Sequence, residues 1–328
     1  MFRLGASRRA SDQVECLSDM TFSQSVKSEI LKTVRNSKGC CATSFLTAVL
    51  KSVGSLTLGS DGYAFSVESD NLDFLTICSG LAASELGVNA EVSSNLTTKG
   101  ATTYNCVFDG TLGEKLGLIS RDGDGALILG DANTLFPTKP CCLRAFLQGL
   151  FVACGSVVIP IDKPVDVSDK SRYHLELRFT DVAFANLVSE GYGELSFRST
   201  PRKNHVILYL KDSEKIADFL VYVNAIKAKL ELENVLVVRS VRNDSNRQTN
   251  CTFANIEKSI AASSKQLAAI ATLRQQGLFD GLSDSLKEIA LLREKYPESN
   301  LDEIADMLNI SKSGANHRFA KLIELAKK

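Results

Sequence analysis

Two similar segments of the sequence each begin with a pair of adjacent cysteines, whose thiols are chemically reactive. Cys40 and Cys41 open the segment CCATSFLTAVLKSVGS, and Cys141 and Cys142 open CCLRAFLQGLFVACGS about a hundred residues later. At the start of a helix, backbone amides favour the thiolate, and such thiols can act as redox sensors. Neighbouring residues on a helix diverge by about 100°, however, so a pair is poorly placed to share one metal ion. We expect these four cysteines to be buried packing residues, and a redox-responsive regulator stays as an alternative.

The remaining cysteines give no further sign of a metal site. The chain has nine cysteines, and none shows the CxxC spacing of zinc and redox motifs, so we expect no metal and no cofactor. Free thiols in this number fit a cytoplasmic protein. No run of about eighteen apolar residues and no apolar signal segment is present, which predicts no membrane span and no secretion.

The overall composition is that of an ordinary globular protein. Hydrophobic residues make up 44% and charged residues 23% of the 328 positions, and the formal net charge is zero. A chain of this length can form two or three domains, each with its own core. Because the global charge indicates no nucleic-acid partner, any such preference must come from local clusters of cations.

The two segments that begin with cysteines are copies of one helix. Aligning Cys40 on Cys141 keeps them in register without a gap, with these coincidences: Phe45/Phe146, Leu46/Leu147, Gly54/Gly155 and Ser55/Ser156. The periodicities after each copy predict helix, two strands, helix, two strands and helix in both halves. Small residues lie four apart on each copy and would let the two helices pack closely: Ala48 and Ser52, and Gly149 and Ala153.

Any catalysis by this duplicated domain would depend on the ends of the repeated helices. LQGLFVACG (147–155) and, more distantly, LTAVLKSVG (46–54) resemble the LAGLIDADG element of homing endonucleases, whose two copies pair. In that family the acidic residue before the final glycine holds a divalent metal over the DNA, and here that position is Val53 or Cys154. Magnesium-assisted cleavage needs hard oxygen ligands, which neither residue offers. We expect a catalytically inactive domain, with an active DNA endonuclease as the alternative.

A helix-turn-helix is predicted at the C-terminus. Asn300 is placed as the N-cap of a helix with Glu303 as its capping-box partner, and Asn309 suits the left-handed turn that follows. Ser311 can cap the last helix, whose apolar residues form one stripe. Residues 283–310 carry three basic and seven acidic side chains, whereas 311–328 carry five basic and one acidic. The positive charge is therefore concentrated on the helix that would enter a major groove.

The polar side chains of that last helix are the candidate DNA-binding residues. They are Lys312, Ser313, Asn316, His317, Arg318 and Lys321. Asparagine can pair with adenine and arginine with guanine, while lysine suits phosphates. Which of them reads a base and which holds a phosphate stays open, and each could alternatively be a solvated surface residue.

The combination of these two domains resembles the WhiA family of bacterial sporulation and cell-division regulators. The resemblance rests on these segments: SQSVKSEI, CCLRAFLQGLFVACGSV followed by YHLELRF, NRQTNCTFANIEK and ISKSGANHRFAKLIELA. The resemblance implies a nucleoid-associated transcription regulator that binds double-stranded DNA mainly through the six residues above, without catalysis or a small-molecule substrate. Some actinobacterial relatives pair with a small iron-sulphur protein of the WhiB type, and the sequence does not show whether this chain does.

The expected fold class is α+β, with five segments. Residues 1–19 are a disordered or misassigned start, 20–130 and 131–238 are the two LAGLIDADG-like halves, 239–281 are a linker and connecting helix, and 282–328 are the helix-turn-helix. The polar run RSVRNDSNRQTN is interpreted as linker or surface loop. Cations on the second half either follow DNA, as in nucleases, or are solvated: Arg178, Arg198, Arg202, Lys203 and Lys211. The domain could instead bind a protein or dimerise.

Overall fold

The computed structural model describes residues 20–59, 62–97, 100–124, 126–160 and 173–327. The expectation for residues 1–19 lies outside these ranges. The chain divides into two compact units, Met1–Leu236 and Val237–Lys328, and each is described by itself.

The first half of the N-terminal unit has the predicted order of elements. After α2 (Phe22–Val34) come α3 (Gly39–Val53), β1 (Ser55–Gly59), β2 (Gly62–Ser69), α4 (Leu72–Leu86), β3 (Ala90–Leu96), β4 (Thr102–Asp109) and α5 (Thr111–Lys115). The strands form an antiparallel sheet in the order β1-β2-β4-β3. Helix α2 begins with a capping box between Thr21 and Gln24.

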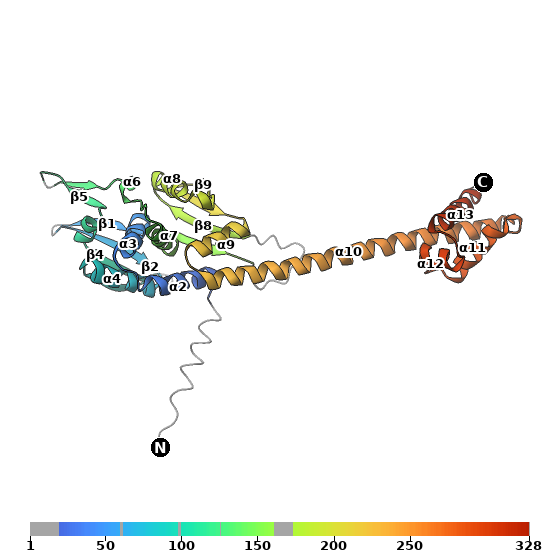
Figure 1. The fold of residues 1–328 in the computed structure, drawn as a ribbon, viewed down its shortest axis with the longest axis horizontal. Coiled ribbons are helices and arrows are strands. Elements are labelled where there is room, and N and C mark those ends of the chain that lie inside the picture. Colours follow the sequence, from blue (N-terminus) through green and yellow to red (C-terminus); the bar gives the residue numbers. More distant parts are fainter. Residues whose placement is uncertain (1–19, 60–61, 98–99, 125, 161–172, 328) are drawn as a thin grey trace, which may run out of the picture. The chain divides into compact units, whose positions relative to one another are not determined.

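The second half repeats this order. It comprises α7 (Pro140–Cys154), β7 (Gly155–Val158), β8 (His174–Phe179), α8 (Val182–Gly191), the short 3₁₀ turn η1 (Gly193–Leu195), β9 (Arg198–Arg202), β10 (His205–Leu210) and α9 (Ser213–Tyr222). Its sheet has the matching order β7-β8-β10-β9. A small hairpin, β5 (Ile119–Arg121) and β6 (Leu127–Leu129), and the short α6 (Ala132–Leu135) join the halves. The duplicated α+β architecture predicted from the sequence is confirmed (Figure 1).

Helices α3 and α7 pack against each other in the middle of this unit (Figure 1). Phe45, Phe146 and Phe151 are almost fully buried between the helices and the two sheets. A Cβ atom on Gly149 would lie 2.6 Å from the backbone oxygen of Phe45 and 2.9 Å from Cβ of Ala48. The absence of a side chain at Gly149 therefore permits the close helix crossing that the small residues predicted.

The boundary between α9 and α10 differs from the sequence interpretation. Asn224 has a positive φ of 61° and separates α9 from α10, so the connecting helix begins before residue 239, where the linker was expected to start. Helix α10 then begins at Ile226, where Glu29 of α2 accepts hydrogen bonds from the backbone amides of Lys227 and Ala228 at 2.8 and 3.1 Å. A carboxylate on these otherwise unpaired amides fixes the start of α10 to the N-terminal unit.

Helix α10 runs from Ile226 to Gln275, so the loop expected at 239–250 is helical. All ten side chains from 241 to 250 are exposed. A solvated helix needs no apolar stripe, which is why its polar sequence resembled a loop. The helix stops just before Gly277, which has a positive φ of 67°.

The C-terminal unit ends in a small helical bundle. After η2 (Phe279–Gly281) come α11 (Asp284–Lys295), α12 (Leu301–Met307) and α13 (Lys312–Leu325). Its core combines the end of α10 with all three helices, at Ile270, Leu273, Ile289, Ile304, Ala315, Phe319 and Leu322 among others. The bundle therefore has a core separate from that of the N-terminal unit.

Candidate functional site

The turn between α12 and α13 has the geometry of a helix-turn-helix. Asn300 accepts hydrogen bonds from the amides of Asp302 and Glu303, and the Glu303 carboxylate accepts from the amide of Asn300 at 3.0 Å, which completes the predicted capping box. At the other end of α12, Asn309 has φ 48°, its amide bonds to Asp306 and that of Ile310 bonds to Ala305. These two bonds form a Schellman motif, which reverses the chain sharply before α13.

Helix α13 presents two different faces. Ala315, Phe319 and Leu322 are buried in the bundle core. The opposite face is open to solvent and carries most of the predicted DNA-binding residues, of which these are exposed: Lys312, Ser313, Asn316, His317 and Lys321. Within the described part of the chain, the side chains of Ser313, Asn316 and His317 form no intramolecular hydrogen bond. Their donors and acceptors are therefore free to meet the edges of bases.

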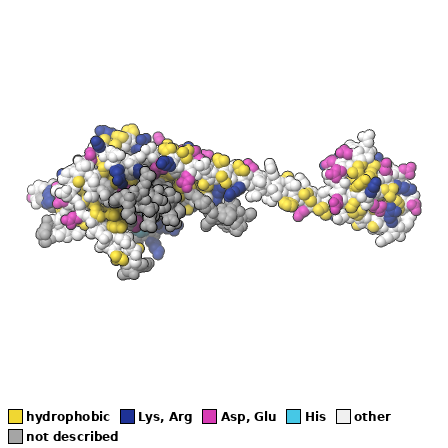
Figure 2. All heavy atoms as spheres, turned by 90° about the horizontal axis from the view of Figure 1, so that it is seen from below, with side chains coloured by type: hydrophobic (Ala, Val, Ile, Leu, Met, Phe, Trp, Pro, Cys, Tyr) yellow, Lys and Arg dark blue, Asp and Glu magenta, His cyan; other side chains and the backbone are white. Residues whose placement is uncertain are grey.

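The three cationic residues of α13 have intramolecular partners. Lys312 pairs with Asp302 of α12 at 2.6 Å, and Lys321 pairs with Glu324 at 3.0 Å. The half-buried Arg318 makes a long contact, 3.5 Å, from Nη1 to the Ser285 carbonyl. Exposed ion pairs contribute about 0–1 kcal/mol, so a phosphate can displace either carboxylate at small cost. Figure 2 shows basic and acidic side chains intermixed on the surface of this bundle.

A buried arginine packs against the core-facing side of α13, and no sequence pattern indicated it. Arg293 of α11 is only 2% exposed, and its Nη1 donates to the carbonyl of Ser299 at 2.5 Å. Its guanidinium also lies 5.2 Å from the centre of the Phe319 ring. Burial lowers the pKa of Arg293. The α11–α12 loop is thus held against α13 by a residue that resembles a surface charge in the sequence.

The C-terminal ends of α3 and α7 lack the ligands of a nuclease. A Cβ atom on Gly54 or Gly155 would clash with the helix's own last turn, at 2.4 Å from the Leu50 oxygen and 2.7 Å from the Phe151 oxygen. The preceding residues are half-buried Val53 and Cys154, and the Cys154 thiol donates to the Leu150 carbonyl of its own helix at 3.2 Å. Burial raises the pKa of Cys154 to about 12, so this thiol stays protonated at neutral pH.

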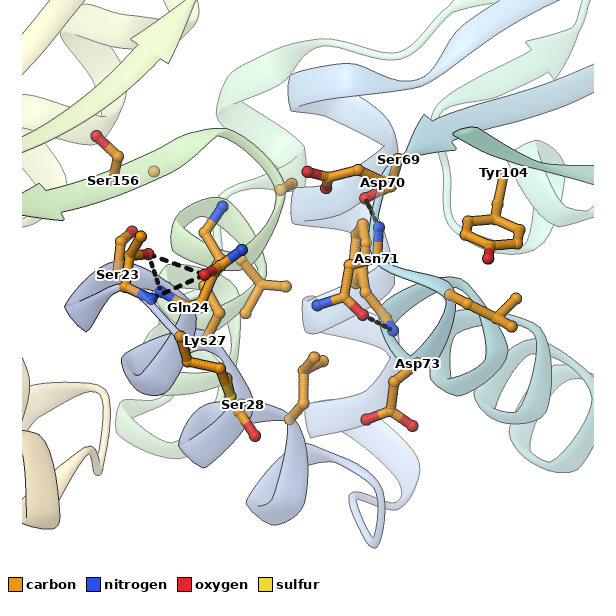
Figure 3. Close-up of a pocket in the computed structure, with 18 residues that line it drawn as sticks. Ser23, Gln24, Lys27, Ser28, Ser69, Asp70, Asn71, Asp73, Tyr104 and Ser156 are labelled. Atoms are coloured by element: carbon orange, nitrogen blue, oxygen red, sulfur yellow. Dashed lines mark hydrogen bonds between the residues drawn. The ribbon is translucent and has the colours of Figure 1, made fainter. Parts of the chain in front are cut away.

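A polar hollow of about 560 Å³ lies beside this end of α7. Ser23, Gln24 and Lys27 of α2 line one side, and Asp70 and Asn71, just after β2, line the other (Figure 3). Burial lowers the pKa of Lys27, against the opposing charge of Asp70. The hollow brings polar groups of both halves together, but no three metal-ligating side chains meet there among the described residues.

At the opposite, N-terminal end of the helix pair, four thiols converge. The sulfur atoms of Cys40, Cys41, Cys141 and Cys142 all lie within 4.8 Å of one another. Cys40 and Cys141 are exposed, Cys41 is half-buried and Cys142 is 5% exposed. The expectation that all four are buried packing residues was therefore wrong for the exposed pair.

The sulfur atoms of adjacent cysteines also lie close together, contrary to the expectation that they diverge. Cys141 Sγ and Cys142 Sγ are 3.9 Å apart, and the Cys142 thiol lies 3.7 Å from the Cys40 carbonyl oxygen. The angle of about 100° separates Cα–Cβ bonds, whereas side-chain rotation can bring two sulfur atoms together. Hydrogen bonds from Cys41 and Cys142 lower the pKa of the Cys141 thiol, while burial raises that of Cys41 to about 12.

The cations of the second sheet do not form one cluster of free charges. Arg178 on β8 pairs with Glu176 of the same strand at 3.3 Å. Arg198 and Arg202 are exposed on β9, Lys203 lies in the following turn, and Lys211 follows β10 and sits 5.0 Å from the Tyr209 ring. On the face of this unit drawn in Figure 2, basic side chains are separated by hydrophobic and polar ones.

Both units match described sequence families. Residues 42–103 and 143–242 match "WhiA LAGLIDADG-like domain", and residues 245–326 match "WhiA C-terminal HTH domain". "Probable cell division protein WhiA" of Desulfitobacterium hafniense (strain DSM 10664 / DCB-2) is 33% identical over 94% of this chain and 96% of its own. The protein of the same name from Syntrophomonas wolfei subsp. wolfei is also 33% identical, over 94% of this chain and 98% of its own.

A solved structure shares the fold. Full-length DUF199/WhiA from Thermatoga maritima superposes with a TM-score of 0.55 at 20% identity, over 94% of this chain and 98% of that one. Among the described residues, no helix has both the length and the apolar character needed to cross a bilayer.

Proposed function

This chain belongs to the WhiA family, and from that premise we propose that it is a sequence-specific DNA-binding transcription regulator whose LAGLIDADG-like domain is catalytically inactive. Helix α13 enters the major groove and the six polar residues predicted from the sequence make the contacts: Lys312, Ser313, Asn316, His317, Arg318 and Lys321. The protein acts at the nucleoid, in cell division and sporulation. A WhiB-type partner stays a prediction of the family resemblance.

The observation that carries this proposal is the construction of α12, its turn and α13. The capping box at Asn300 and the left-handed Asn309 fix the angle between the helices. The apolar face of α13 is buried, so the face that carries Asn316 and His317 must be the one offered to solvent. An exposed helix with free amide and imidazole groups, flanked by exchangeable lysines, has the donors and acceptors that base readout requires.

Absence of cleavage follows from the chemistry at the ends of α3 and α7. Val53 has no donor atom, and Cys154 offers a protonated thiol that donates within its own helix. Magnesium binds carboxylate, carbonyl and water oxygens in preference to a thiol. Two carboxylates line the polar hollow, Asp70 and Asp73, and Asp73 is paired with Arg35 at 2.5 Å. Neither stands at the end of a repeated helix, where the nuclease mechanism needs its pair of ligands.

A selection from genomic DNA tests the proposal. The full-length protein is incubated with sheared DNA of its own species in magnesium buffer, and the retained fragments are sequenced and their ends are mapped. We expect discrete, uncut promoter fragments for the wild type and for Lys295→Ala, which removes an exposed cation of α11. The double variant Asn316→Ala/His317→Ala should lose this enrichment while keeping weak, sequence-independent binding.

Two outcomes would contradict the proposal. Fragments ending at one common position would mean that the LAGLIDADG-like domain still cuts. Equal enrichment by the wild type and the double variant would mean that another surface reads the sequence.

A further inference from the structure

The four clustered thiols come from corresponding positions of the two halves. Lys38-Gly39-Cys40-Cys41 begins α3 in the same way that Lys139-Pro140-Cys141-Cys142 begins α7, with each lysine as the N-cap residue. Pairing of the two helices brings both N-termini to one place, and the four sulfur atoms lie within 4.8 Å of one another there. The N-cap residues Lys38 and Lys139 make no capping hydrogen bond with their side chains.

We propose that Cys40, Cys41, Cys141 and Cys142 form a tetrathiolate site for one zinc ion that joins the two halves of the N-terminal unit. This site is distinct from the DNA-binding face of α13 and does not depend on the regulatory function proposed above.

The spacing of the sulfur atoms fits a single tetrahedral ion. Zinc–sulfur bonds are about 2.3 Å long, so two sulfur atoms of a tetrahedral site lie about 3.8 Å apart. Cys141 Sγ and Cys142 Sγ are already 3.9 Å apart. The widest separation in the cluster, 4.8 Å at most, needs a closure of about 1 Å, which small side-chain rotations supply. Ligands around a polynuclear cluster would have to spread further apart than this.

The donor set selects the kind of metal. Four thiolates favour zinc over magnesium or calcium, because the latter prefer hard oxygen ligands. Four protein ligands also leave no open coordination position, which is typical of structural rather than catalytic zinc. Binding forms four zinc–sulfur bonds and releases the four thiol protons to solvent, with no change in oxidation state.

The surroundings suit the negative charge of such a site. The positive ends of both helix dipoles favour thiolates at these positions, although the first amide of α3, that of Gly39, already donates to the Glu85 carboxylate at 2.7 Å. Lys38 and Lys139 add two positive charges directly before the two first turns. The exposed Cys40 and Cys141 leave a route by which the ion can enter.

Metal content and a cobalt spectrum of the full chain test this proposal. Protein is purified without oxygen under reducing conditions, dialysed against zinc and analysed for zinc per chain, and the metal-free protein is titrated with cobalt(II). The double variant Cys40→Ser/Cys141→Ser alters the two exposed thiols, so folding should survive and circular dichroism can verify it. Cys251→Ser is the matched control, because Cys251 is an exposed thiol of α10 outside the cluster.

We expect one zinc per chain and the intense visible bands of tetrahedral cobalt–thiolate for the wild type and Cys251→Ser. The double variant should bind zinc at least about 100-fold more weakly, since even outer-shell changes cost 10–100-fold. Equal zinc affinity in the double variant and the wild type would overturn the site. A disulfide between the two cysteine pairs in the oxygen-free wild-type protein would also overturn it.

Discussion

The two ends of the paired helices α3 and α7 carry different chemistry. At the C-terminal end, where the resemblance places catalytic carboxylates, the chain has Val53 and a protonated Cys154 thiol. At the N-terminal end four thiols lie within 4.8 Å of one another. Gly54 and Gly155 follow the last residues of α3 and α7, and a Cβ atom on either glycine would clash with the preceding helical turn. The two ends of the helix pair thus offer a metal ion different side chains.

The largest effect that would test this comparison is a difference between metals. Zinc at about 100 times its dissociation constant should stabilise the folded wild type by about 2.7 kcal/mol, because only the folded state assembles the four thiols. Magnesium should leave the unfolding temperature unchanged, since the C-terminal ends offer it no ligand pair. Thermal unfolding of reduced protein with each metal measures both effects. If magnesium stabilised both the wild type and Cys40→Ser/Cys141→Ser, the protein would have a magnesium site with oxygen ligands outside the thiol cluster.

A smaller effect is expected at the crossing between the two ends. Gly149→Ala would put a methyl group 2.6 Å from the Phe45 oxygen, so α3 and α7 must move apart. We expect a loss of about 1–3 kcal/mol in the free energy of unfolding, as for other overpacked sites. Urea unfolding of the N-terminal unit, followed by circular dichroism, measures it.

The matched control for this crossing is Gly80→Ala on α4. Gly80 is exposed, and nothing lies within 4 Å of a Cβ built there. Alanine at this position should stabilise the helix by about 0.5–1 kcal/mol. If both substitutions changed stability in the same direction, the close approach of α3 and α7 would not be what Gly149 permits.

The sequence predicted the elements well because each signal was local. The duplicated order of helices and strands followed from hydrophobic periodicity, and the helix-turn-helix followed from Asn300, Glu303 and Asn309, whose capping and left-handed geometry the structure confirms. The polar part of α10 was mistaken for a loop because periodicity reports which face is buried, and no face is buried from 241 to 250.

The thiol cluster could not be predicted from either cysteine pair alone. It depends on where two helices 101 positions apart in the duplication meet, which is a property of tertiary packing. A signal was nevertheless present, since both copies begin with the same Lys-x-Cys-Cys pattern and the two copies were expected to pair. Arg293 gave no comparable signal, because nothing in its neighbourhood distinguishes a buried arginine from a solvated one.

The second sheet and α13 also differ in how their polar side chains are placed. On the sheet, Arg178 is paired with Glu176 and Lys211 lies against Tyr209, whereas α13 presents its polar residues on one solvated face. If DNA lies on α13 alone, Arg318→Ala and Lys321→Ala should each weaken binding to all sequences. Each should also flatten the dependence of log affinity on log salt by about one unit, through loss of one phosphate contact.

The matching substitutions on the sheet give the smallest expected effect. Arg178→Ala and Lys211→Ala remove the same charges from the LAGLIDADG-like surface, and we expect the salt slope and the affinity to stay unchanged. Fluorescence anisotropy with one labelled duplex at several salt concentrations compares all four variants with the wild type. A reduced slope in the sheet variants would mean that DNA also contacts the sheet of the LAGLIDADG-like domain. An unchanged slope in the α13 variants would instead remove that helix from the phosphate backbone.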